Sequence, residues 1–109
     1  MNLEKITEGL LDTFLNAGQI AKEISIRGVK ITIKSDRTPV TDGDLAVDKI
    51  LKIKIKSLTP DIPIISEETV NLKVKNTYKT FWLLDPIDGT KDYISKKDEY
   101  TLNAALILD

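Results

Sequence analysis

In the stretch FWLLDPIDGTKDY, residues 81–93, an apolar run typical of a buried strand stops at an aspartate. A second aspartate follows three residues later, next to a glycine and a threonine. Pro86 keeps Asp85 extended, and Gly89 permits a backbone conformation that other residues resist. Two carboxylates aimed at one point repel each other unless a cation lies between them. A plain Asp-Gly turn between two strands is the simpler interpretation, but this many specified residues directly after an apolar strand favour a site.

Composition limits the chemistry that such a site can use. The 109 residues contain no cysteine and no histidine, which excludes disulfides, thiolate or imidazole metal ligands and Ser-His-Asp chemistry. Any metal ion must therefore be bound by oxygen, which favours hard cations such as Mg²⁺. The net charge of −1 gives no electrostatic case for a nucleic acid polymer or an anionic membrane.

The sequence also bears on where the protein is located. The first residues carry charges and form no continuous apolar segment, so they do not resemble a signal peptide. No apolar run reaches the roughly 18 residues that a membrane span needs. We therefore expect a cytoplasmic protein without a transmembrane segment, and peripheral association with the inner membrane is left open.

Helical and strand patterns alternate along the chain, which indicates an α/β or α+β fold. Apolar residues at helical spacing predict an amphipathic helix over 2–26, interrupted near Gly18 and ended by Gly28. Apolar and polar residues alternate over 29–34, which predicts a strand, and Pro and Gly predict a loop over 35–44.

A second helix is predicted from Leu45, with Asp42 or Asp44 near its N-terminus in the place of a cap. The second half of KILKIKIKSL, residues 49–58, alternates strictly and also allows a strand. The remaining expected elements are a short strand at Ile64–Ile65, a polar connection over 69–79, a strand over 80–84, a short turn or helix from Thr90 and a last strand over 100–108.

Carboxylates gather at three predicted strand or loop ends, at Asp44, at Glu67–Glu68, and at Asp85 with Asp88. Thr90 can offer a hydroxyl and backbone N–H groups to a phosphate oxygen. These parts suit a metal-assisted phosphate-ester hydrolase, in which cations hold the phosphate and acidify a bound water. Asp44 alone is explained equally well as a helix cap, and adjacent glutamates alone as a solvated loop.

Three motifs in this order, TPVTDGD (38–44), IPIISEE (62–68) and WLLDPIDGTKDY (82–93), resemble those of the Mg²⁺-dependent, lithium-sensitive inositol monophosphatase superfamily. Together with EYTLNAALI (99–107), they are most similar to its CysQ-type 3'(2'),5'-bisphosphate nucleotidases. The resemblance implies the N-terminal portion of a layered αβαβα sugar-phosphatase fold, two or three Mg²⁺ ions, and hydrolysis of adenosine 3',5'-bisphosphate to AMP. An inositol or sugar monophosphatase of the same superfamily is the alternative.

The resemblance also implies roles for the residues of these motifs. Glu67 would bind the first metal ion and help to activate the water, and Thr90 would orient that water. Asp85 would bridge two metal ions, Ile87 would give its carbonyl oxygen to the first ion, and Asp88 would hold the second. The same resemblance implies further assignments: substrate contacts by Glu67, Ile87, Asp88, Gly89 and Thr90, a further metal ion near Asp44, and support of the site by Glu68.

The last predicted strand runs apolar to Leu108 with no covering element after it. Relatives of the resembled type continue into a second half that supplies a further metal ligand and much of the nucleotide pocket. We therefore expect residues 1–109 to be the N-terminal part of an inositol monophosphatase-like domain, with little or no activity alone and with apolar surface that promotes self-association. A non-catalytic remnant or metal-binding module is the alternative from another class.

Overall fold

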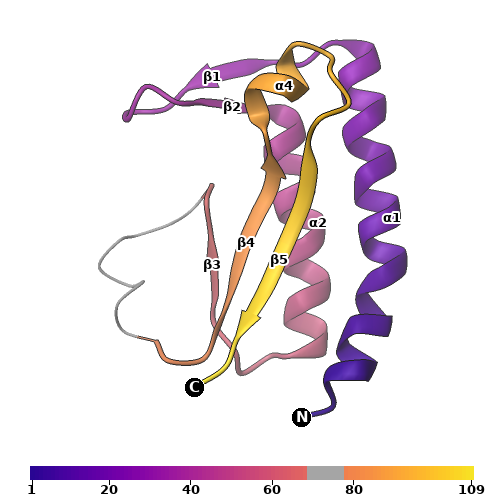
Figure 1. Ribbon diagram of the computed structural model, residues 1–109, viewed down its shortest axis with the longest axis vertical. Coiled ribbons are helices and arrows are strands. Elements are labelled where there is room, and N and C mark those ends of the chain that lie inside the picture. The colour runs from indigo at the N-terminus through magenta and orange to yellow at the C-terminus, as the bar shows by residue number, and fades with distance from the viewer. Residues whose placement is uncertain (69–77) are drawn as a thin grey trace.

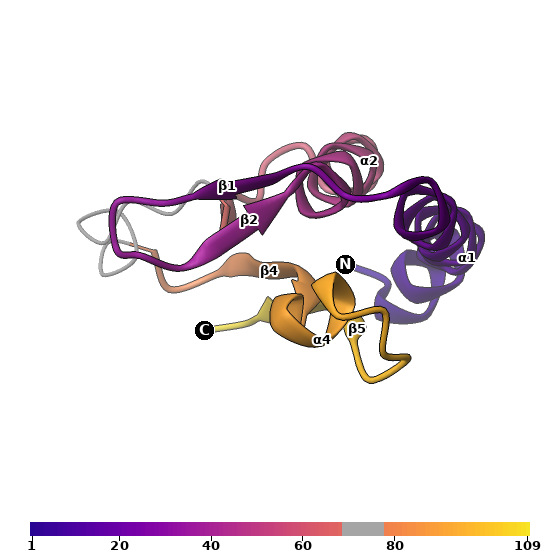
Figure 2. The same ribbon diagram turned by 90° about the horizontal axis from the view of Figure 1, so that it is seen from above.

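Two long helices cover one face of a small sheet in the computed structural model, which describes residues 1–68 and 78–109 (Figures 1 and 2). Helices α1 (Leu3–Arg27) and α2 (Asp42–Leu58) pack side by side, and both contribute apolar residues to one core. The buried apolar side chains of the two helices recur at helical spacing: Leu10, Ala17 and Ala21 in α1, and Val47, Leu51 and Ile55 in α2.

The sheet has three strands in the order β3 (Ile64–Ser66), β4 (Phe81–Asp88) and β5 (Thr101–Ile107). The strands β3 and β4 run parallel, whereas β4 and β5 run antiparallel. Trp82 and Leu84 of β4 are buried in the core beneath the helices. The molecule is therefore a layered α+β fold, as the sequence predicts.

Three short elements gather at one end of the sheet, where β3 and β4 finish (Figure 1). The strands β1 (Ile31–Ile33) and β2 (Pro39–Thr41) form an antiparallel hairpin, and α4 (Thr90–Ile94) follows β4 directly. The chain termini lie at the opposite end (Figure 1). Every sequence motif that suggested chemistry therefore belongs to one end of the molecule.

The first helix has the predicted length, lies one residue further along the chain, and is more regular than predicted. It runs without a break through Gly18, so the predicted interruption there is wrong. Burial of Ala17 and Ala21 on the core side holds this part of the helix in place. The predicted end is confirmed, because Gly28 caps the helix with a φ of 108° and donates its N–H to the carbonyl of Ile24.

The second helix begins at Asp42 and not at Leu45, and β2 occupies part of the predicted loop. Its cap is Thr41, so the prediction that Asp42 or Asp44 takes the cap position is wrong. Thr41 and Asp44 instead form a capping box, in which each side chain accepts the backbone N–H of the other. The helix is continuous to Leu58, so the alternative of a strand in its second half is also wrong.

Strand β4 extends four residues beyond the predicted end at residue 84, through the motif as far as Asp88. Its pairing with β5 joins Asp85 to Asn103 and Asp88 to Thr101, which leaves one extra residue in β4 and makes a β-bulge. Pro86 lies in this bulge, where a missing N–H is tolerated. Most of the connection predicted over 69–79 lies outside the described residues.

Candidate functional site

A cleft of about 460 Å³ opens where the hairpin, the end of β3 and the start of α4 meet. We call it the acidic cleft. Its lining residues come from three separate segments of the chain. They are Lys34, Asp36, Thr38 and Pro39 of the hairpin, Glu67 and Glu68 after β3, and Asp85, Ile87, Asp88, Gly89, Thr90, Lys91 and Asp92 of β4 and α4.

Parallel pairing of β3 and β4 places two of the predicted metal ligands beside each other. Ser66 is paired with Leu84, so Glu67, the first residue after β3, lies beside Asp85, which is the next residue of β4. The Glu67 N–H donates to the carbonyl of Leu84 at 2.9 Å, which fixes the glutamate backbone against β4. The sheet thus brings together carboxylates that are eighteen residues apart in the sequence.

The bulge in β4 sets the second aspartate of the motif apart from the first. Asp85 is half-buried, whereas Asp88 is exposed. The side-chain amide of Asn103 on β5 donates to Asp88 at 3.4 Å. Asp85 and Asp88 therefore line the same cleft with different exposure, and Ile87 lines it as well.

Gly89 is required by the geometry of the turn between β4 and α4. Its φ of 93° and ψ of 42° lie in the left-handed region. A Cβ atom at this position would also lie 2.9 Å from the carbonyl oxygen of Glu99. Both constraints exclude a side chain, so Gly89 fixes how Thr90 enters α4 at the cleft.

Thr90, which lines the cleft, is hydrogen-bonded to Asp44, which does not line it. The Thr90 hydroxyl lies 3.1 Å from Asp44 Oδ1 and 3.2 Å from the Ile87 carbonyl, and its single proton can be donated to either. Asp44 is fully buried, and its other oxygen accepts the N–H and the hydroxyl of Thr41. Donation to Asp44 leaves the Thr90 oxygen as an acceptor that can orient a water in the cleft.

The structure therefore places Asp44 as the support of Thr90 and not among the residues that line the cleft. Its predicted relation to a further metal ion stays a prediction. The other predicted site residues, which are Glu67, Glu68, Asp85, Ile87, Asp88, Gly89 and Thr90, all line the acidic cleft.

Glu68 is a buried carboxylate whose negative charge is only partly balanced by its neighbours. Its side chain is 6% exposed, and its Oε2 atom has no hydrogen-bond partner. The ammonium of Lys34 is 3.9 Å away. Burial, opposed by Lys34 and assisted by the negative charges of Asp44, Asp48 and Asp85, raises the pKa of Glu68 from an ordinary 4.5 to about 7.

The pKa of Asp85 is raised for related reasons. Burial is the largest cause, followed by the negative charges of Asp88, Glu67 and Asp44. Lys34 acts in the opposite direction. Negative charge therefore accumulates in the acidic cleft beyond what its own cations neutralise, and a bound divalent cation would relieve it.

The residues of the acidic cleft are of the type that binds a divalent cation. The donors are the carboxylates of Glu67, Asp85 and Asp88 and the carbonyl of Ile87, which are all oxygen ligands of the type that hard cations prefer. Within residues 1–68 and 78–109, no three carboxylates already lie close enough together to hold an ion by themselves. A cation held here would therefore complete its coordination with the Ile87 carbonyl, waters or phosphate oxygens.

Sequence reasoning missed several residues of the cleft. Lys34 forms an ion pair with Glu68 at 3.9 Å, and the sequence showed it only as the last residue of the predicted strand over 29–34. Asp36 accepts the N–H and hydroxyl of Thr38 and so shapes the tip of the hairpin. Lys91 and Asp92 lie in the first turn of α4. These four residues line the cleft only because the hairpin folds back over the start of α4, and no local sequence pattern predicts that arrangement.

Replacing Glu68 with glutamine is expected to flatten the dependence of stability on pH. A carboxyl group with a raised pKa binds its proton more tightly in the folded protein, so its contribution to stability is full below about 4.5 and is lost as the pH rises through about 7. Urea unfolding at several pH values in this window, followed by the fluorescence of the single tryptophan, Trp82, measures the effect. A Glu68→Gln variant that loses stability as steeply as the parent protein would contradict the assignment.

The described part of the chain has no helix that is both long and apolar enough to cross a membrane. Residues 2–109 match the inositol monophosphatase family along almost the whole sequence. The chain belongs to that family. It is 33% identical over 106 residues to the 3'(2'),5'-bisphosphate nucleotidase CysQ of Aggregatibacter actinomycetemcomitans, which covers 95% of this chain and 39% of that relative.

Solved structures agree with the fold. CysQ from Bacteroides thetaiotaomicron, a bacterial member of the same family, superposes with a TM-score of 0.64 at 27% identity, over 97% of this chain and 39% of that one. An IMPase/NADP phosphatase complexed with NADP and Ca²⁺ superposes with a TM-score of 0.84 at 19% identity, over 99% of this chain and 41% of that one. The chain thus spans about two fifths of the length of the relatives that it matches.

Proposed function

We propose that this chain carries the N-terminal part of the active site of a Mg²⁺-dependent phosphatase that removes the 3'-phosphate of adenosine 3',5'-bisphosphate to give AMP. The observation that supports the proposal most directly is the meeting of Glu67, Asp85 and Asp88 in one cleft at neighbouring strand ends. Similarity to a CysQ nucleotidase supports the substrate, and the Ca²⁺ complex of a structural neighbour supports a divalent cation. The proposed compartment is the cytoplasm.

The residues of the acidic cleft divide the chemistry among them. Glu67, Asp85, Asp88 and the Ile87 carbonyl would hold the cations, which supply positive charge against the phosphate and lower the pKa of a bound water. Thr90, which can donate its hydroxyl hydrogen bond to Asp44, would accept a hydrogen bond from the attacking water and so orient it. Gly89, which lines the cleft in a left-handed conformation, would set the direction in which the backbone at Thr90 faces a phosphate oxygen.

Binding and turnover test this function separately. We expect the 109-residue chain to bind adenosine 3',5'-bisphosphate only when Mg²⁺ is present, and to release phosphate slowly or not at all. Calorimetry measures the first, and a phosphate-release assay the second. An Asp85→Asn variant serves as the control, because it keeps the shape of the site and removes one charge. Absence of Mg²⁺-dependent binding would overturn the proposal, and turnover as fast as that of a full-length relative would contradict the expected low activity.

Inositol 1-phosphate offered in competition decides between the two substrates of the superfamily. Preference for the bisphosphate supports the nucleotidase branch, whereas preference for the inositol ester supports the alternative. If the chain binds Mg²⁺ but binds neither ester, the result would favour a metal-binding module.

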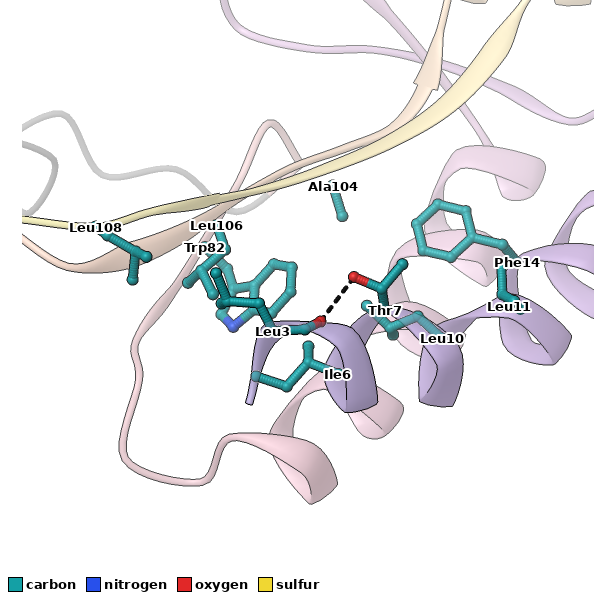
Figure 3. A pocket seen from close by; sticks show the side chains of 10 residues that line it. All are labelled: Leu3, Ile6, Thr7, Leu10, Leu11, Phe14, Trp82, Ala104, Leu106 and Leu108. Atoms are coloured by element: carbon teal, nitrogen blue, oxygen red, sulfur yellow. Dashed lines mark hydrogen bonds between the residues drawn. The ribbon is translucent and has the colours of Figure 1, made fainter. Parts of the chain in front are cut away.

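We also propose that the chain self-associates through an apolar groove between α1 and β5. The groove has a volume of about 370 Å³, and Figure 3 shows side chains of α1 facing Trp82 and the end of β5 across it. Strand β5 forms the edge of the described sheet and carries no charged residue, so its edge lacks the protection that monomeric proteins usually have. The groove is lined by Leu3, Ile6, Thr7, Leu10, Leu11, Phe14, Trp82, Ala104, Leu106 and Leu108.

The chain exposes more surface than a compact monomer of its mass, which is enough for an interface with a second copy. The chain exposes 7189 Å², compared with roughly 6,100 Å² for a compact monomer of 12.2 kDa. The difference is comparable to the ~800 Å² that each partner buries in a standard interface. Leu11 and Leu15 of α1 are 57% and 74% exposed on the same helix.

Self-association predicts a concentration-dependent mass above 12.2 kDa in sedimentation equilibrium. Leu11→Lys, in the groove, is expected to shift the protein to monomer. Ile53→Lys is the matched control, because Ile53 is 64% exposed on α2 and does not line the groove. A monomer at all concentrations, or equal effects of the two variants, would exclude this surface.

A further inference from the structure

We propose that Asp48 and Ser66 are positioning residues that fix the two glutamates of the acidic cleft. The inference rests on the proposed function, in which Glu67 and Glu68 belong to the metal site. Neither Asp48 nor Ser66 lines the cleft. Both act through the backbone of the segment that follows β3.

A chain of hydrogen bonds connects helix α2 to this segment. The Ser66 hydroxyl donates to Asp48 Oδ1, across a sequence separation of 18 residues. The same hydroxyl accepts the backbone N–H of Glu68 at 3.3 Å. The Ser66 side chain therefore stabilises a turn by bonding the backbone two residues later, as serine side chains commonly do. Asp48 fixes the orientation of the hydroxyl.

The aspartate is suited to this task because it is buried and compensated. Asp48 is 6% exposed and Ser66 is fully buried. The ammonium of Lys52, one turn further along α2, lies 2.9 Å from Asp48 Oδ2. The two oxygens of Asp48 thus have separate partners, and the carboxylate is a fixed acceptor with little freedom to rotate away from Ser66.

The other bond that holds this segment comes from the opposite side. Glu67 donates its N–H to Leu84 of β4, so the segment is fixed between α2 and β4. Loss of the Ser66 hydroxyl would leave the Glu68 N–H without this acceptor. Glu67 and Glu68 would then sample other directions, although the sheet and the helices would stay in place.

Amide hydrogen exchange of the metal-free protein tests the positioning directly. We expect Ser66→Ala to speed exchange of the Glu68 N–H about tenfold, which corresponds to the loss of one hydrogen bond. Asp48→Asn keeps an oxygen acceptor for Ser66 and is expected to change the rate less than about threefold.

Thr59→Val is the matched control. Thr59 is also a buried hydroxyl, which accepts from Trp82 Nε1 at 3.0 Å and donates to the Ile55 carbonyl at 2.9 Å. Its loss should lower global stability without selective change at Glu67 or Glu68. Equal exchange at Glu68 in Ser66→Ala and the parent protein, or the same pattern in Thr59→Val, would overturn the proposal.

Calorimetry with Mg²⁺ on the same variants separates this inference from the proposed function. Faster exchange together with weaker Mg²⁺ binding in Ser66→Ala supports both. Faster exchange in a protein whose parent form binds no Mg²⁺ supports the positioning role and removes the proposed metal site. Unchanged exchange overturns the positioning role, whatever the cation does.

Discussion

Replacing Asp85 with asparagine is expected to stabilise the metal-free protein at neutral pH and to remove its stabilisation by Mg²⁺. The pKa of Asp85 is raised by burial and by the nearby charges of Asp88, Glu67 and Asp44. A raised pKa means that the folded protein holds the ionised form less favourably than the unfolded chain does, so stability is lost as the pH rises above the ordinary value of 3.8. Asparagine has a similar shape and removes that cost.

The negative charge of Asp85 would also attract a bound cation. A Mg²⁺ concentration 100-fold above the dissociation constant stabilises a folded protein by about 2.7 kcal/mol. The parent protein should therefore gain stability on addition of Mg²⁺, whereas Asp85→Asn should gain little. The order of stability of the two proteins should reverse between the metal-free and the Mg²⁺-saturated state.

Thermal unfolding followed by circular dichroism, with Mg²⁺ and with a chelator, measures this reversal. Asp61→Asn is the control, because Asp61 is an exposed aspartate in the connection before β3, at the other end of that strand from the cleft. It should respond to Mg²⁺ as the parent does. An Asp85→Asn protein that is less stable without metal, or that keeps the full response to Mg²⁺, would show that the cleft does not concentrate negative charge as described.

The fold was predictable where the signal is local. The apolar positions of both helices, the stop at Gly28 and the apolar run before Asp85 all report on neighbours within a few residues. The start of α2 also had a local signal, since a threonine three residues before Asp44 is the pattern of a capping box. That signal was overlooked in favour of Asp42 and Asp44 themselves.

Other features depend on contacts between distant segments and were not predictable from one sequence. The extension of β4 to Asp88 depends on its pairing with β5, and the bulge depends on the register of that pairing. The hydrogen bond between Ser66 and Asp48 depends on which face of α2 is turned towards the sheet. The candidate site was found because its proposed ligands follow apolar runs in the sequence. The residues that support it, such as Asp48 and Tyr93, look like ordinary helix residues in the sequence.

Replacing Gly43 with alanine is expected to destabilise the protein by roughly 1–3 kcal/mol, as overpacking of a close contact does. A Cβ atom at Gly43 would lie 2.8 Å from two ring carbons of Tyr93, and closer still to its hydroxyl oxygen. Tyr93 has no free space to move into, because it is fully buried and packs edge-on against Tyr100 at a centroid distance of 4.9 Å. Its hydroxyl also donates to the carbonyl of Ala21 at 2.6 Å.

The contact matters for the site because Tyr93 joins α4 to both long helices. Displacement of the ring moves α4, and with it Thr90, away from Asp44. Gly18→Ala is the matched control, since a Cβ atom there meets nothing within 4 Å and the position is inside α1. This variant should gain about 0.5–1 kcal/mol. Urea unfolding of the two variants should therefore move the midpoint in opposite directions, and a Gly43→Ala protein as stable as the parent would show that the ring has room to shift.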